Sequence, residues 1–179
     1  MNHNEETASE QKGRKKTAAN KNAFTVKIDK RDSGIKLYEH QRLACTQMTR
    51  QILHGKVPFK GMLILPTGGG KTMTAAYWIA RNIVDKGIKV LWVAHRHELL
   101  TQACDTFAKR LAYGDIFPNR SSLNLRVISG IHDKAVNVRP NDDILFASKD
   151  SLSSESSFEF LKENWLAGQN ELFRCNGQN

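Results

Sequence analysis

Short apolar runs alternate with longer segments of helical periodicity along most of this chain, and that order restricts the fold more than any other feature. Four runs are typical of buried strands: 61–65, 88–94, 123–129 and 142–148. Four segments have the spacing of amphipathic helices: 37–54, 72–87, 96–114 and 157–166. Because strands and helices take turns, the sequence predicts an α/β fold, with a parallel sheet flanked by helices.

Length and composition limit the chain to one hydrophobic core. A chain of 179 residues with 40% hydrophobic content buries a single domain of ordinary size. Residues 1–33 contain almost no large apolar side chain before Phe24, so burial cannot offset the entropy lost on ordering them. We therefore expect a disordered basic tail over 1–33 and a folded domain over 34–179.

The net charge of +9 is unevenly distributed along the chain. Residues 34–139 carry 16 basic and 6 acidic groups, whereas residues 140–179 carry 3 basic and 7 acidic groups. A basic excess in the middle of the chain supports contact with a polyanion such as nucleic acid. The same excess also fits an ordinary solvated surface.

The cysteines and the hydropathy pattern exclude several classes of protein. Cys45, Cys104 and Cys175 are odd in number and far apart, so they indicate neither a disulfide framework nor a zinc site. No apolar run approaches the ~20 residues that a membrane span needs, and the N-terminus lacks a signal-peptide pattern. We expect a cytoplasmic protein with reduced thiols.

Three consecutive glycines in the stretch "LPTGGGKT" stand between a predicted strand and a predicted helix. Glycine lets the backbone approach a phosphate closely, and the start of the following helix favours an anion. In such a loop Lys71 reaches the β- and γ-phosphates, and the Thr72 hydroxyl binds Mg²⁺. The strict pattern G-x-x-x-x-G-K-[ST] has a glycine where this chain has Leu65. The alternative is a glycine-rich turn with a surface Lys-Thr pair.

Three further segments accompany the loop: "LYEHQRLA" at 37–44, "VAHRHELLTQA" at 93–103 and "ILFASKDSL" at 144–152. In this order around "PTGGGKT" they resemble the first RecA-like domain of superfamily 2 helicases, in the DEAD/DEAH-box-like group that includes restriction-enzyme motor subunits. The likeness covers residues 36–152. Phosphate loops of that family often replace the first glycine and keep a proline, as here with Pro66. The resemblance implies a RecA-like P-loop NTPase domain over 34–179, incomplete at its C-terminus.

The resemblance also implies ATP and Mg²⁺ as cofactors. It assigns these residues to the phosphate loop: Thr67, Gly68, Gly69, Gly70, Lys71 and Thr72. Lys71 and Thr72 take the catalytic roles, and Thr72 is the Mg²⁺ ligand. Gln41 in "YEHQ" matches the family's adenine-reading glutamine, whose amide pairs with donor and acceptor edges of the base. Without these neighbours, an exposed helical glutamine is the simpler interpretation.

A nucleic-acid contact is implied at two places. The segment "AHRHEL" is similar to the family's motif Ia, in which His95 and Arg96 meet the phosphate backbone of one strand. Ser148 stands where the family's T-x-Q-S-L segment has threonine, whereas Asp150 replaces the glutamine and repels phosphate. An ion pair between Arg96 and Glu98, or a helix N-cap at Ser148 or Asp150, explains these residues without a ligand. The restriction-like character of "AHRHELL" favours DNA over RNA.

The acidic motif of the helicase family is missing. That motif is a strand ending in Asp-Glu, whose acids order Mg²⁺ and polarise the attacking water, and the 179 residues contain no Asp-Glu pair. Asp142 and Asp143 precede their apolar run, so we expect them at the wrong end of the strand, in water. The family's second RecA-like domain is also missing. We therefore expect a fragment with very slow ATP hydrolysis, no unwinding of its own, and an unpaired sheet edge prone to aggregation.

Three functions remain open. The leading one is the N-terminal part of an ATP-dependent DNA helicase or translocase that works with other subunits of a larger complex. The second is a non-catalytic module that binds nucleotide or nucleic acid and uses the loop as a structural anion site. The third is another P-loop enzyme such as a kinase, which leaves "YEHQ" and "AHRHEL" unexplained.

Overall fold

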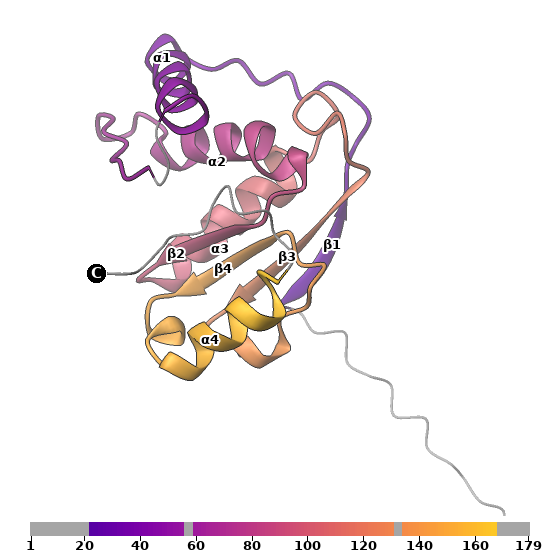
Figure 1. Ribbon diagram of the computed structural model, residues 1–179. Coiled ribbons are helices and arrows are strands. Elements are labelled where there is room, and N and C mark those ends of the chain that lie inside the picture. Colours follow the sequence, from indigo (N-terminus) through magenta and orange to yellow (C-terminus); the bar gives the residue numbers. More distant parts are fainter. Residues whose placement is uncertain (1–21, 56–58, 131–133, 168–179) are drawn as a thin grey trace, which may run out of the picture.

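The computed structural model describes residues 22–55, 59–130 and 134–167. A four-stranded sheet in the order β1-β3-β4-β2 forms its centre, with helices against both faces (Figure 1). The strands are β1 (Ala23–Lys27), β2 (Val90–Ala94), β3 (Ser122–Ile128) and β4 (Ile144–Ser148). The longer helices are α1 (Glu39–Met48), α2 (Lys71–Asn82), α3 (His97–Asp105) and α4 (Glu155–Asn164). The short helical turns are η1 (Thr49–Leu53), η2 (Val84–Lys86), η3 (Thr106–Arg110), η4 (Ala135–Asn137) and η5 (Asp150–Leu152).

The three strands β3, β4 and β2 run parallel, which confirms the predicted α/β class. Because they are parallel, their carboxyl ends meet at one edge of the sheet. Ala94 at the end of β2 pairs there with Ser148 at the end of β4. Open α/β sheets place their binding clefts outside this edge. None of the helices in the described ranges is long and apolar enough to cross a membrane.

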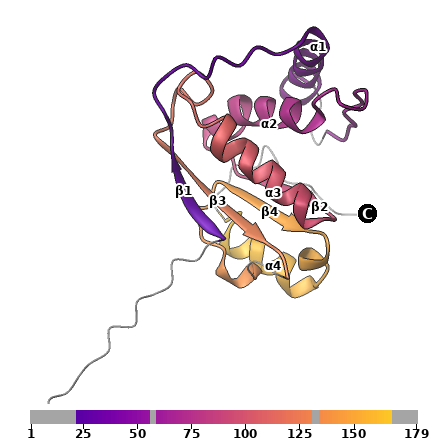
Figure 2. The same ribbon diagram turned by 180° about the vertical axis from the view of Figure 1, so that it is seen from behind.

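The sheet separates two apolar clusters. The larger cluster lies under α2 and α3, on the side that faces the viewer in Figure 2, and the smaller one lies under α4. Alternate residues of β4 enter different clusters, with Ile144 and Phe146 in the larger and Leu145 and Ala147 in the smaller. Burial on both faces therefore explains why this strand is a continuous apolar run.

Residues 22–33 differ from the expected disordered tail. Strand β1 lies in this segment and pairs antiparallel with β3, from Ala23 opposite Arg126 to Lys27 opposite Ser122. Phe24, Thr25 and Val26 are residue types enriched in strands. The outer edge of β3 offers a ladder of hydrogen-bonding groups, and Val26 packs against the larger cluster. The remainder of the predicted tail, residues 1–21, lies outside the described residues.

The predicted strand over 61–65 is wrong. This segment has no strand structure, and the side chains of Met62 and Ile64 are 85% and 79% exposed. A strand exists only where a neighbour supplies hydrogen-bond partners for its backbone. None of the four described strands pairs with 61–65, so its apolar composition alone does not make it a strand.

The acidic pair at the start of β4 has a structural role. As predicted, Asp142 and Asp143 lie at the amino end of the strand, opposite to the edge where clefts form. The expectation that they stay in water is wrong. Asp142 is buried and accepts a 2.6 Å hydrogen bond from the Arg126 guanidinium, while Asp143 pairs with Arg120. The indole of Trp165 donates to the Asp142 carbonyl at 2.7 Å, which anchors the end of α4 at this edge.

Candidate nucleotide-binding loop and carboxyl edge

The glycine-rich loop has the backbone geometry that the sequence predicts for it. Gly68 and Gly70 adopt φ of +76° and +74°, a left-handed conformation that disfavours any residue with a Cβ. The Gly69 amide donates to the Pro66 carbonyl at 2.9 Å, and a Cβ built on Gly69 would lie 2.9 Å from that carbonyl oxygen. Each of the three positions therefore requires glycine, for strain or for space.

The start of α2 suits an anion. Among the described side chains, none caps this helix at Gly70, and its first turn, from Lys71, contains no acidic residue. The first N–H groups of a helix have no partner within it, and the positive end of the helix dipole favours negative charge there. A Cβ built on Gly68 meets no atom within 4 Å, so the loop is open on that side. The loop and helix together fit a phosphate group.

The three polar side chains of the loop have different surroundings. Lys71 is exposed, and its ammonium donates to the carbonyl oxygens of Leu65 and Pro66 at 3.0 and 3.1 Å. Thr72 is half-buried and Thr67 is exposed. Two neutral carbonyls hold the lysine beside the loop, and a bound anion would offer the ammonium a charged acceptor instead.

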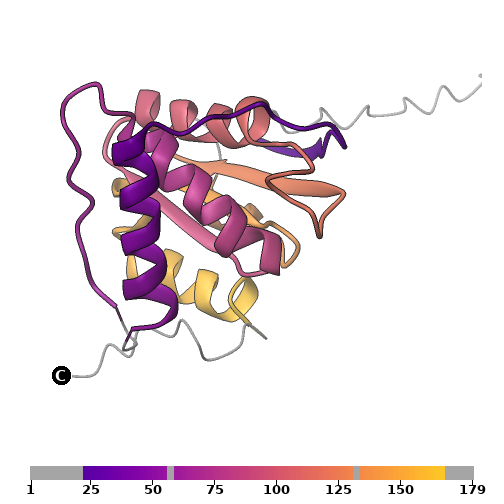
Figure 3. The ribbon, with the colours of Figure 1, turned by 90° about the horizontal axis from the view of Figure 1, so that it is seen from above.

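Gln41 connects α1 to the loop. Its side chain is only 6% exposed, so the interpretation as an exposed helical glutamine is wrong. Its amide nitrogen donates to the Gly69 carbonyl at 3.2 Å, and its amide oxygen accepts from the Tyr38 amide at 3.0 Å. Helix α1 packs beside α2, which brings together residues 28 positions apart (Figure 3). Thus the predicted adenine reader lies against the predicted phosphate loop.

His40 is a loop contact that the sequence analysis missed. Its Nε2 lies 3.1 Å from the Gly69 carbonyl oxygen, the same atom to which Gln41 donates. The His40 ring also stacks on the ring of Tyr38, with centroids 5.8 Å apart and an interplanar angle of 8°. The only available signal was its position next to Gln41, because nothing in the local pattern shows where the loop will lie.

The carboxyl edge of the sheet brings two distant segments together. His95 and Arg96 follow β2 directly, and both are exposed. They lie beside the end of β4, because the Lys149 amide donates to the Ala94 carbonyl at 3.1 Å. Within the described part of the chain, Arg96 forms no ion pair with Glu98, so the alternative explanation for this arginine is not seen.

The Ser148 hydroxyl at this edge is buried and bonded within the protein. The residue is 5% exposed, and its Oγ lies 2.8 Å from the Ser151 hydroxyl and accepts from the Ser151 amide at 3.2 Å. These bonds join Ser148 to the turn η5. The N-cap residue of η5 is Lys149, without a side-chain cap, so among the described residues an N-cap at Ser148 or Asp150 is not seen. Asp150 begins η5 and is exposed.

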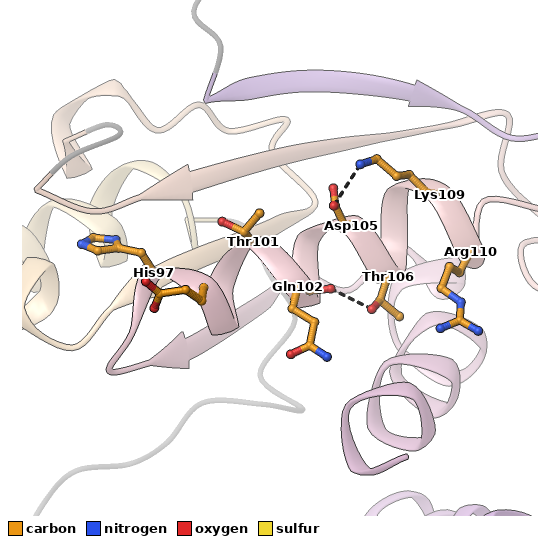
Figure 4. A pocket seen from close by; sticks show the side chains of 8 residues that line it. His97, Thr101, Gln102, Asp105, Thr106, Lys109 and Arg110 are labelled. Atoms are coloured by element: carbon orange, nitrogen blue, oxygen red, sulfur yellow. Dashed lines mark hydrogen bonds and ion pairs between the residues drawn. The ribbon is translucent and has the colours of Figure 1, made fainter. Parts of the chain in front are cut away.

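A groove follows one side of α3 and η3, between His97 and Arg110 (Figure 4). Its side chains are polar and carry both signs of charge. Lys109 pairs with Asp105 at 2.9 Å, and the Thr106 hydroxyl donates to the Gln102 carbonyl at 2.8 Å. With its charges mixed and partly paired, the groove indicates no particular ligand.

The comparison with known proteins agrees with this geometry. The family model for the res subunit of type III restriction enzymes matches residues 34–173, most of the chain. Neither a curated protein nor a solved structure matches. The matched range contains the loop, Gln41 and the carboxyl edge. The chain therefore belongs to the type III restriction enzyme res subunit family, whose members have a helicase-like RecA domain.

Proposed function

We propose that this chain is the ATP-binding portion of an ATP-dependent DNA helicase or translocase. Membership of the family establishes the general kind of domain, a helicase-like ATPase. The observation that carries the proposal is the assembly of Gln41, the three loop glycines and the open start of α2 from segments far apart in the sequence. A glycine-rich surface turn has no need of a buried glutamine against its backbone.

Mg-ATP fits the loop, and the roles of its residues follow from their positions. The amides at the start of α2 bind phosphate oxygens, and Lys71 exchanges its two carbonyl partners for a phosphate. Thr72, in the first turn of α2, supplies a hydroxyl to Mg²⁺. Thr67 lines the loop on the exposed side. When bound, the metal neutralises charge on the phosphates.

The proposed nucleic-acid-binding surface is the carboxyl edge of the sheet. His95 and Arg96 are exposed beyond β2, where a phosphate backbone can reach them. Ser148 takes part through the position it gives the turn after β4, since its hydroxyl bonds to Ser151. DNA is the proposed polymer, and other subunits of a larger complex are the proposed protein partners.

Hydrolysis by the chain alone is proposed to be very slow. The 179 residues contain no Asp-Glu pair. Asp142 and Asp143 cannot replace it, because they lie at the amino edge of the sheet and already pair with Arg126 and Arg120. A steady-state ATPase rate well above that of Mg-ATP in buffer, and abolished by Lys71→Ala, would contradict this part of the proposal.

One observation favours a non-catalytic binding module as the second candidate. Both polar groups of the Gln41 amide already bond within the protein, to the Tyr38 amide and the Gly69 carbonyl. If these bonds persist, the Gln41 amide is not available to bind adenine, and the loop binds an anion whatever base is attached to it. DNA binding that depends on salt and is indifferent to ATP would favour this candidate.

The test is equilibrium binding of a fluorescent ATP analogue with Mg²⁺. We expect Lys71→Ala and Gln41→Ala to weaken binding, while Lys86→Ala and Gln102→Ala, which change exposed residues of the same types elsewhere, leave it unchanged. Competition by ATP and GTP separates the two candidates, because only an adenine reader prefers ATP. Absence of any binding by protein that circular dichroism shows to be folded would refute nucleotide binding.

A further inference from the structure

Lys149 is the first residue after β4, and its backbone is held on both sides. Its amide donates to the Ala94 carbonyl at 3.1 Å, and its carbonyl accepts from the Leu152 amide at 3.1 Å. Its side chain is exposed. A cation at this position is therefore fixed to the end of the sheet, while its ammonium remains in solvent.

Arg96 lies beyond the end of the neighbouring strand, two residues after Ala94, whereas Lys149 is one residue after Ser148. Ala94 and Ser148 are direct partners in the parallel ladder, and adjacent strands lie about 4.8 Å apart. Arg96 and Lys149 thus follow neighbouring strand ends at the same edge. Within the described ranges, neither side chain forms an ion pair.

The hydroxyl that the sequence pattern favours at the end of β4 is buried and already bonded within the protein. The buried Ser148 hydroxyl bonds to the amide and hydroxyl of Ser151. A phosphate at the edge would instead meet the exposed ammonium of Lys149. The two acids beside these cations, Glu98 in the first turn of α3 and Asp150, are both exposed, so solvent screens their repulsion.

We propose that Lys149 is a phosphate-binding residue for a nucleic-acid strand, acting with Arg96 across the carboxyl ends of β4 and β2. Ser148 is then a positioning residue, whose hydroxyl holds the turn that presents Lys149. This inference rests on the proposed function, because it assigns a further residue to the same nucleic-acid-binding surface. The two cations contact the phosphate backbone of the nucleic acid and therefore give no preference for base sequence.

The experiment is fluorescence anisotropy of a short labelled oligothymidine titrated with the full chain, between about 50 and 200 mM salt. Each phosphate contact with a single strand contributes about 0.7 to the slope of log K against log salt, or about fivefold in affinity at ~0.1 M salt. Lys149→Gln and Arg96→Gln should each lower the slope and the affinity by these amounts. The control is Lys162→Gln, which removes the same charge from α4, near the end that Trp165 anchors to the amino edge.

The outcomes separate this inference from the proposed function. Suppose the unchanged chain binds DNA, but Lys149→Gln and Lys162→Gln have the same affinity and salt slope. That result would overturn the role of Lys149 and leave the proposed function in place. Absence of DNA binding by the folded, unchanged chain would overturn both. Ser148→Ala tests the positioning role, because it removes the bonds to Ser151 that hold the turn. It should lower the affinity for DNA in the unchanged background but cause no further loss in the Lys149→Gln background. An equal loss in both backgrounds would instead assign a separate phosphate contact to the hydroxyl.

Discussion

A comparison of two alanine substitutions tests whether Gln41 is coupled to the phosphate loop. Gly68 and Gly70 have nearly the same φ, +76° and +74°, so replacing either one forces an alanine into the same left-handed conformation. Their surroundings differ. A Cβ at Gly68 meets nothing within 4 Å, whereas a Cβ at Gly70 lies 2.5 Å from the amide nitrogen of Gln41. Gly68→Ala is therefore a matched control for Gly70→Ala.

The expected magnitudes follow from these contacts. The left-handed conformation costs an alanine about 1–2 kcal/mol, and the loss of unfolded-state entropy offsets about 0.4–1 kcal/mol of it. Gly68→Ala should thus lower the free energy of unfolding by about 1 kcal/mol. Gly70→Ala should also displace Gln41, which loses its bonds to the Tyr38 amide and the Gly69 carbonyl. At about 0.5–1.5 kcal/mol per bond, the additional loss is roughly 2 kcal/mol.

The assay is urea denaturation monitored by tryptophan fluorescence. It is applied to each glycine variant alone and to each one combined with Gln41→Ala. Once Gln41 is absent, Gly70→Ala should cost no more than Gly68→Ala, so the double-mutant cycle should give a coupling of roughly 2 kcal/mol. Gly68→Ala should show no such coupling. Equal costs for the two glycines, or a Gly70→Ala cost that persists in the Gln41→Ala background, would refute the proposed contact.

Three other predictions concern ionisable groups and the core. Hydrogen bonds from the side chain and the backbone amide of Arg31 lower the pKa of Asp29 from 3.8 to about 2, so they favour the folded state above pH 3.8 and this contribution is lost as the pH falls toward 2. Arg31→Gln keeps the backbone amide, so an NMR titration of this variant should find the Asp29 pKa raised only part of the way to 3.8. Burial raises the pKa of the Cys104 thiol to about 12, so peptide mapping should find Cys104 unmodified by iodoacetamide until urea is added, and labelling in the folded state would contradict its burial. Arg126→Met leaves the buried Asp142 carboxylate without its charged partner, although the Arg139 amide still donates to it. The substitution should lower the free energy of unfolding by about 3–5 kcal/mol in urea denaturation, and a loss below ~1 kcal/mol would mean that water reaches the pair.

The sequence determines most of the secondary structure on its own. Continuous apolar runs predict β2, β3 and β4, and helical spacing predicts α1 to α4, because each of these patterns reports which faces of an element are covered. The glycine-rich loop is also local information. Three consecutive glycines already indicate positive φ and close backbone contacts, because other residue types fit neither well.

Where the sequence failed, the missing information was a partner. Strand β1 lies in a segment expected to be disordered and pairs with the outer edge of β3. The segment 61–65 is apolar but remains irregular, because no described strand pairs with it. Asp142 is expected in water but is buried, since Arg126 on the next strand supplies a charge.

The candidate site divides in the same way. The sequence by itself determined the loop and the residue types that a nucleotide requires, because these depend on neighbours along the chain. Only the tertiary structure brought Gln41 and His40 to the Gly69 carbonyl and set Lys149 beside the end of β2. These contacts depend on strand register and helix packing, which join residues far apart in the sequence and leave no local trace in it.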